Sequence, residues 1–265
     1  METALLGILL LAQLAAVGWK HSSLRRFLSP DRSTTTDLIL FAANAVGLAG
    51  YLGIVCSLGL VWIIQKALPV HGSRLAAFSS GNAIADFLLY LLATHFIDYW
   101  NHRFWHSRFG WPAHRLHHSA TYFSPLLAWR IHPIQLLSQA WVPILPLMLM
   151  GILPLTLGAV ALLNTFLSML VHVDANWDWG WFGRWIVCEP RFHRIHHSPL
   201  SEHADKNFSV IPLFDHIFGT WYSGEVKAEA IGISEPIHNR RAFWREIIAD
   251  TLDLLRCSKL ARSFR

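Results

Sequence analysis

Five long apolar runs restrict the folds open to this chain more than any other feature of its sequence. They cover residues 3–19, 38–65, 83–100, 134–151 and 155–171. A helix of about 20 apolar residues crosses a bilayer, and Gly151 and Pro154 supply a turn between the last two runs. The first run lacks the basic start and the cleavage site of a signal peptide, which favours a retained helix. We therefore predict an all-α, multi-pass integral membrane bundle of four or five transmembrane helices.

Composition and charge are consistent with that prediction. Only 15% of the 265 residues are charged, whereas a soluble domain carries about 25%. The net charge of +5 comes from Lys and Arg beside the apolar runs, which favours membrane-protein loops and argues against a nucleic-acid partner. If each run crosses the membrane, the loops between them lie on alternate sides, and every Lys and Arg except Lys66 and Arg74 falls on the same side. The positive-inside rule makes that side cytoplasmic. We expect the C-terminus on that side of a bacterial inner membrane or the endoplasmic reticulum.

Three histidine motifs lie on the predicted cytoplasmic side. Side chains three or four residues apart share one face of a helix, so each motif directs two or three imidazoles the same way. Neutral imidazole binds Fe, Zn, Cu and Ni, and eight such ligands exceed the need of one ion. The pattern predicts two metal ions with about four nitrogens each, held in a histidine-rich cytosolic cap. The motifs are His102-x3-His106, His114-x2-His117-His118 and His193-x2-His196-His197.

Residues beside the motifs extend the predicted site. His172 stands where the fifth apolar run ends, and we expect it to be a ninth ligand. Metal-bound histidines usually donate their other ring N–H to a carboxylate or carbonyl, and Asp98 is placed for this four residues before His102. His132 is either a ligand or a hydrogen-bonding partner of one. Asp174, Asp205 and Asp215 are further partners, or else helix caps and surface charges.

The ordered set of motifs resembles the fatty acid hydroxylase / sterol desaturase superfamily. The segments are DYWNHRFWH, HRLHHS, WRIHP, PRFHRIHHS, DKNF and DHIFGTWY, and they run from about Phe87 to Tyr222. The resemblance implies a helical membrane protein with a cytosolic di-iron centre, O2 as co-substrate and a lipid substrate. It also implies two electrons from a reductase, ferredoxin or cytochrome b5-type donor. The eight motif histidines match those of the superfamily, and His172 matches an additional one.

Two departures from the superfamily pattern affect the surroundings of the metals. Gln135 stands where many members have a glutamate, and Asn176 stands where some have a second histidine after His172. We expect two Fe ions, and Zn can take their place in purified protein because it displaces iron at imidazole sites. Residues that we expect to support the ligands by hydrogen bonds are Asp98, His132, Asn176, Asp205 and Asn207.

The chain divides into three predicted parts. Residues 1–82 hold the N-terminal transmembrane helices, 83–222 the catalytic domain and 223–265 a cytosolic tail with an amphipathic helix at 243–255.

Breaking an unactivated C–H bond requires a redox cofactor, because side chains supply no such oxidant. We expect a membrane-bound di-iron oxygenase that hydroxylates or desaturates a lipid, with no separate acid or base. Sterol-type chemistry leads, because HRIHHS with DKNF and FGTWY looks most like the sterol desaturase branch. Fatty acyl, ether-lipid and carotenoid hydroxylation remain open. A non-catalytic metal-binding membrane protein and a zinc hydrolase are the alternatives from other classes; the absence of HExxH disfavours the latter.

Overall fold

A computed structural model describes residues 1–47, 80–139, 154–226, 230–233 and 242–263, with single positions at Tyr51, Val55, Gly59, Trp62 and Val142. All regular elements in these residues are helices, which confirms the all-α prediction. The predicted runs 38–65 and 134–151, and the turn between Gly151 and Pro154, lie largely outside them.

The N-terminal part consists of three helices, and polar side chains cap the second and the third. They are α1 (Glu2–Val17), α2 (Ser23–Leu28) and α3 (Arg32–Ala45), with a 3-10 turn η1 (Trp19–His21) after α1. The Asp31 carboxylate caps α3 by accepting from the Thr34 backbone N–H at 2.7 Å. Leu6, Leu9 and Leu10 of α1 pack against Met169 in the principal apolar core.

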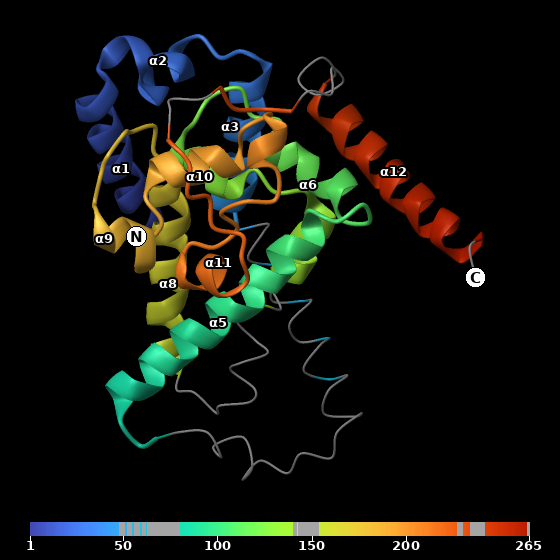
Figure 1. Cartoon of the computed structure of the whole chain (residues 1–265). Coiled ribbons are helices and arrows are strands. Elements are labelled where there is room, and N and C mark those ends of the chain that lie inside the picture. The colour runs from blue at the N-terminus through green and yellow to red at the C-terminus, as the bar shows by residue number, and fades with distance from the viewer. Residues whose placement is uncertain are drawn as a thin grey trace.

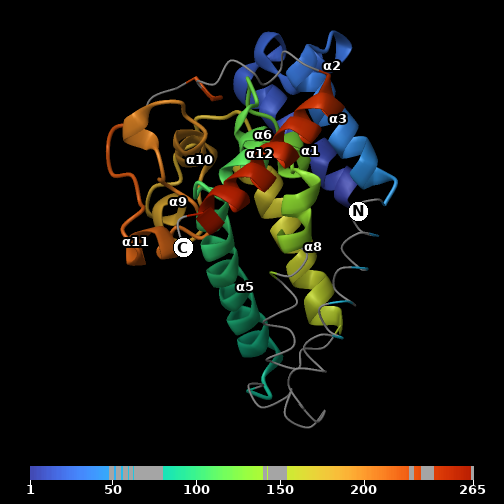
Figure 2. The same cartoon turned by 90° about the vertical axis from the view of Figure 1, so that its right-hand side faces the viewer.

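Two long helices, α5 (Ala83–Trp105) and α8 (Pro154–Val171), carry the chain toward the histidine motifs. Figure 1 and Figure 2 show both helices running away from the cluster of shorter helices that contains α6 and α10. The Asn82 side chain caps α5 by accepting from the backbone N–H of Ile84 and Ala85. The helix continues past the apolar run that predicts it, so that His102 lies in its last turn.

The remaining elements are short and surround the histidine motifs. They are α6 (Trp111–His118), η2 (Pro125–Trp129), α9 (Trp181–Trp185), α10 (Pro190–His196), η3 (Ser201–His203) and α11 (Leu213–Ile217). Proline opens α10 and occupies the first turn of α6, where its missing N–H has no helical partner to lose.

The C-terminal helix α12 (Phe243–Ser263) lies along α6 in both views of the molecule (Figures 1 and 2). It begins where the amphipathic helix at 243–255 is predicted and runs further. Its exposed apolar side chains are Trp244, Ile248, Leu252 and Leu255.

Three predicted membrane runs coincide with described helices: 3–19 with α1, 83–100 with α5 and 155–171 with α8. Within the described part of the chain, no helix is both long enough and apolar enough to cross a membrane.

Candidate metal centre

The three histidine motifs and His172 come from four different helices that meet at one place. His102 and His106 lie at the C-terminal end of α5, and His172 directly follows α8. The HRLHH motif forms the last turns of α6, and the HRIHH motif forms those of α10. All nine predicted ligands are therefore brought together.

These nine imidazoles divide into two groups, each with its ligand atoms within 4.8 Å of one another. The division follows helix geometry: in each HxxHH motif the outer histidines, four residues apart, join one group, and the middle histidine joins the other. The five-histidine group is His102, His106, His114, His118 and His196. The four-histidine group is His117, His172, His193 and His197.

Contacts between Nε2 atoms indicate a shared cation in each group. In the five-histidine group His102 Nε2 lies 3.1 Å from Nε2 of both His114 and His196. In the four-histidine group His193 Nε2 lies 3.1 Å from His172 Nε2. Two nitrogens about 2.0–2.1 Å from one metal ion stand about 3.0–3.4 Å apart, depending on the coordination angle. The spacing is therefore that of ligands around a common ion.

The opposite ring nitrogens are held by hydrogen bonds that orient the imidazoles. The Nδ1–H of His102, His172 and His196 can donate to the backbone carbonyls of Phe208, Ser168 and Lys206 at 2.7, 2.6 and 2.8 Å. A proton on Nδ1 leaves the Nε2 lone pair free for a metal. When both rings carry their proton on Nδ1, neither Nε2 has a hydrogen to donate to the other. Two Nε2 atoms this close therefore need a third group between them that accepts both lone pairs.

Side chains orient two more ligands. Gln135 Oε1 accepts from His114 Nδ1 at 3.0 Å, so the residue that replaces the superfamily's glutamate still contacts a ligand. The Asp205 carboxylate lies 3.4 Å from His106 Nδ1. Asp205 adopts a positive φ of 56°, a conformation that Asp and Asn tolerate better than most residues.

A braced loop at 207–209 presents the carbonyl that orients His102. Asn207, at φ 53°, donates from Nδ2 to the Phe192 carbonyl at 2.9 Å and accepts from the Tyr222 backbone N–H. The buried Asp215 carboxylate accepts from the backbone N–H of Phe208 and of Ser209 at 2.8 and 2.9 Å. Asn207 and Asp215 therefore act on the ligands through the backbone of residues 207–209.

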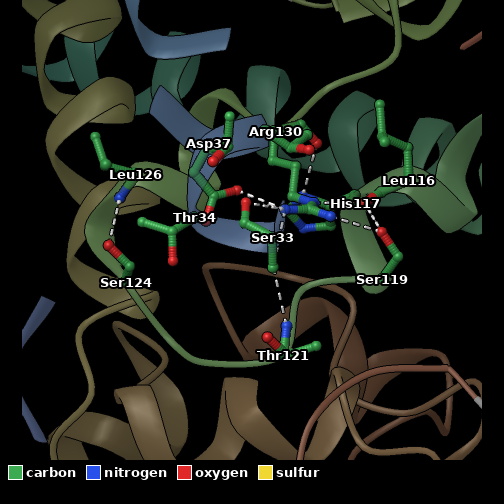
Figure 3. A network of polar contacts seen from close by, with 12 residues as sticks. Ser33, Thr34, Asp37, Leu116, His117, Ser119, Thr121, Ser124, Leu126 and Arg130 are labelled. Atoms are coloured by element: carbon green, nitrogen blue, oxygen red, sulfur yellow. Dashed lines mark hydrogen bonds and ion pairs between the residues drawn. The ribbon is translucent and has the colours of Figure 1, made fainter. Parts of the chain in front are cut away.

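A buried arginine holds the segment that orients His117 (Figure 3). Arg130 is fully buried and pairs with Asp37 of α3 at 2.8 Å. Its guanidinium also donates to the Leu116 carbonyl and to Ser119 Oγ, both at 2.8 Å, which ties it to the end of α6. The Arg130 carbonyl in turn accepts from His117 Nδ1 at 3.3 Å. Asp37 on α3 is thereby linked to the four-histidine group.

A second ion-pair network fastens α12 to α6. Arg115 stands between His114 and His117 in sequence and pairs with Asp250 and Asp253, each at 2.6 Å. The Asp250 side chain is fully buried, whereas that of Asp253 is 36% exposed.

Burial lowers the pKa of all nine imidazoles, and neighbouring histidines lower most of them further. The pKa of His102 and of His172 falls to about 4. The rings are therefore neutral at pH 7, which is the state that binds a metal ion.

The donor set fits two bound metal ions. Within the described residues, both ring nitrogens of His197 and the Nδ1 atom of His193 are buried without a hydrogen-bond partner. Buried polar atoms in native proteins are rarely left without any partner. A cation among the four imidazoles supplies the partner for His197 that the protein does not. Both groups are thus able to bind metal ions.

Several residues expected near the metals lie elsewhere. His132 contacts α12, with Nε2 3.2 Å from the Ile247 carbonyl, and belongs to neither group. Asn176 and Asp174 both accept hydrogen bonds from Arg194. Asp98 lines the cavity beside His102, whose Nδ1 is oriented by Phe208 instead.

A cavity of about 330 Å³ opens onto both metal groups. It is lined by histidines of both groups, which are His102 and His114 of the five-histidine group and His117, His172 and His193 of the four-histidine group. Its walls come from α5, from α8 and from residues 128–142.

The chain belongs to the fatty acid hydroxylase family, which it matches over residues 87–220. It is 28% identical over 207 residues to an ornithine lipid hydroxylase of Rhizobium tropici, covering 73% of this chain and 59% of that protein. It is 23% identical over 174 residues to a very-long-chain aldehyde decarbonylase of Oryza sativa subsp. japonica, covering 61% and 27%. It is 27% identical over 161 residues to an alkylglycerol monooxygenase of Xenopus tropicalis, covering 60% and 35%.

The chain therefore spans less than two thirds of the length of these three relatives. None of the three is named for a sterol, so the expected preference for sterol-type chemistry gains no support. No solved structure matches the chain.

Proposed function

We propose that this protein is a di-iron oxygenase that hydroxylates a lipid at an unactivated C–H bond. The reaction joins lipid C–H, O2, two electrons and two protons to give lipid C–OH and water. The observation that carries the proposal is the pair of buried histidine groups, members of both of which line one cavity. Membership in the fatty acid hydroxylase family, and relatives named as hydroxylase and monooxygenase, support the class of reaction.

The metal is iron in this proposal because the chemistry requires a redox ion. Two irons held by the nine histidines would supply the oxygen activation that C–H cleavage needs. Zinc has no redox chemistry and would give an inactive protein. Two electrons come from a separate reductase, ferredoxin or cytochrome partner.

In this proposal the protein's own residues orient the metal ligands and line the space for the substrate. Oxygen atoms of Phe208, Ser168, Gln135 and Arg130 accept hydrogen bonds from four of the imidazoles and fix their direction, which sets where an ion would be held. The neutral rings add no charge to the cavity. Apolar wall residues such as Trp129 and Val171 exclude water beside the substrate.

We infer that the protein acts at a membrane with its histidine groups on the cytoplasmic side. The long helix α5 presents exposed apolar side chains along its length, among them Ile84, Leu88, Phe96 and Phe104. A contiguous apolar surface of this kind is unfavourable in water and suits contact with lipid. The distribution of Lys and Arg supports the same orientation.

Metal content and lipid turnover of detergent-purified protein test the proposal. We expect about two irons per chain, with a loss of about one in His196→Ala and of about one in His197→Ala, since these belong to different groups. His21→Ala, which changes an exposed histidine outside both groups, is the control. One zinc per chain with esterase or amidase activity would favour a hydrolase. Full iron loading without oxidation of any lipid, despite O2 and a reductase, would refute the oxygenase.

A further inference from the structure

Two short helices beside the histidine motifs, α9 and α11, expose large apolar side chains on one face each. In α9 and the residue that follows it, positions 181, 182, 185 and 186 share a face because helical positions four apart lie above one another. Positions 213 and 217 share a face of α11 in the same way. We call these two faces together the shelf. Its side chains are 36% to 67% exposed, and they are Trp181, Phe182, Trp185, Ile186, Leu213 and Ile217.

Contacts hold the two helices to each other and to the metal site. Trp185 of α9 stacks on His216 of α11, with ring centroids 3.9 Å apart and an interplanar angle of 12°. His216 Nε2 also lies 3.0 Å from the Arg184 carbonyl, to which it can donate. On the inner side of α11, the buried Asp215 carboxylate braces residues 208–209. The shelf is therefore the outer surface of a fixed part of the molecule.

The shelf continues the exposed apolar surface of α5. Phe218, directly after α11, packs against Trp100 of α5 with ring centroids 4.9 Å apart, and Phe214 packs against Phe96 at 5.9 Å. Trp100 and Phe96 are themselves exposed. In both views, α9 and α11 lie on the side of α6 and α10 toward which α5 and α8 extend (Figures 1 and 2). The shelf therefore adjoins the surface of α5 that we propose to contact lipid.

Arginines lie beside the exposed rings of this surface. Arg184 of α9 is exposed, and the Arg103 guanidinium lies 5.2 Å from the centre of the Trp100 ring. Asp178, three residues before α9, is paired with Arg191 at 2.8 Å, which largely offsets its charge. Tryptophans are enriched at the boundary between hydrocarbon and headgroups, and arginine there reaches toward the phosphates. The composition of the surface thus fits an anionic lipid leaflet.

We propose that α9 and α11 lie in the surface of the cytoplasmic leaflet, with the shelf among the lipid chains and Arg184 at anionic headgroups. The inference rests on the proposed membrane location and deepens it, because it fixes the height of the metal groups above the bilayer. Trp100, at the boundary, precedes His102 and His106 by about 3 and 9 Å along the axis of α5. A lipid must then rise only about 10 Å from the leaflet to reach these ligands.

Spin labels on the protein in nanodiscs, with one chain in each disc, test this position without iron or turnover. Single cysteines replace Trp181 on α9 or Ile217 on α11, in a background with Cys56 and Cys257 changed to serine. Cys188 is buried and is kept. We expect both labels to collide often with O2, which dissolves in lipid, and rarely with a water-soluble nickel chelate.

Lys20→Cys is the matched control. Lys20 is exposed and lies in η1, just before α2, which both views place at the end of the molecule opposite to the extended ends of α5 and α8 (Figures 1 and 2). We expect the opposite pattern for its label, with frequent nickel collisions. All three substitutions change exposed side chains, and elution as a single species from gel filtration checks that each variant is folded.

Lipid charge tests the role of Arg184. A fluorescent label at position 181 should be quenched roughly two- to fivefold more by nitroxide-labelled phosphatidylglycerol than by nitroxide-labelled phosphatidylcholine, because an arginine near the surface attracts anionic lipid. Arg184→Gln should remove that preference. The bond from His216 to the Arg184 carbonyl involves the backbone and is retained in this variant.

Three results would overturn the inference. Frequent nickel collisions at both shelf positions would place the shelf in water. Labels screened from both reagents would show that protein covers the shelf. Equal quenching by the two lipids would remove the anionic partner. Conversely, a lipid-exposed shelf in a protein that binds no iron would support this inference and refute the oxygenase.

Discussion

The buried pair between Arg130 and Asp37 gives the sharpest test of how the N-terminal helices support the metal centre. In Asp37→Asn the side chain keeps its shape and loses its charge, so the guanidinium of Arg130 is left as an uncompensated buried cation. Both side chains are fully buried and 2.8 Å apart. Removing one partner of such a pair costs about 3–5 kcal/mol. We expect a decrease of that size in the free energy of unfolding.

The same substitution should weaken metal binding at a distance. Arg130 orients His117 through its carbonyl and holds the end of α6 through Leu116 and Ser119. Loss of a residue that supports a metal ligand typically costs about 10–100-fold in metal affinity. We expect that decrease in the four-histidine group, which contains His117.

Denaturant titration in detergent micelles and metal titration by mass spectrometry measure the two effects. Asp31→Asn is the matched control on the same helix, because asparagine caps a helix about as well as aspartate and the change should cost only a few tenths of a kcal/mol. If Asp37→Asn unfolds within about 1 kcal/mol of the wild type and still binds two ions equally well, the reasoning from this pair is wrong.

Three further outcomes follow from the site. The pKa of His102 is about 4 in the folded chain and 6.5 in the unfolded chain, so the unfolded chain binds the proton first as the pH falls. The free energy of unfolding of the metal-free protein should therefore decrease between about pH 6.5 and pH 4, as measured by circular dichroism. Gln135→Leu should lower metal affinity about 10–100-fold while Gln135→Glu retains it, as measured by metal titration. Asp250→Asn should cost about 3–5 kcal/mol of unfolding free energy, whereas the part-exposed Asp253→Asn should cost about 1 kcal/mol or less, and equal costs would contradict the difference in burial.

Part of the gathering of the nine histidines could be predicted from the sequence, because helix periodicity places histidines four residues apart on the same face of a helix. His114 and His118, like His193 and His197, are four residues apart and join the same group, as the helical period requires. The assignment of His117 and His196 to different groups could not be predicted in this way. It depends on how α6 and α10 face one another, which no local pattern encodes.

Most partners of the ligands could not be predicted, because they are backbone carbonyls. Every residue has one, so nothing in the sequence distinguishes Phe208, Ser168 or Arg130 as an acceptor. Of the carboxylates predicted to orient ligands, Asp205 lies beside His106. Asp98 does not orient His102 among the described contacts, because the Phe208 carbonyl takes that place. The pairing of Arg130 with Asp37 joins residues distant in sequence and likewise has no local signal.

The ion pairs between Arg115 and α12 affect when the metal site can form during synthesis of the chain. Arg115 flanks two ligands, yet its partners Asp250 and Asp253 follow it by 135 and 138 residues. During synthesis, the three histidine motifs all leave the ribosome before the acidic side chains that neutralise this arginine. A cation that reaches the emerging chain at this stage meets clustered imidazoles beside a positive charge that Asp250 and Asp253 do not yet offset. We therefore expect metal to bind more weakly to a chain that ends before α12 than to the full chain.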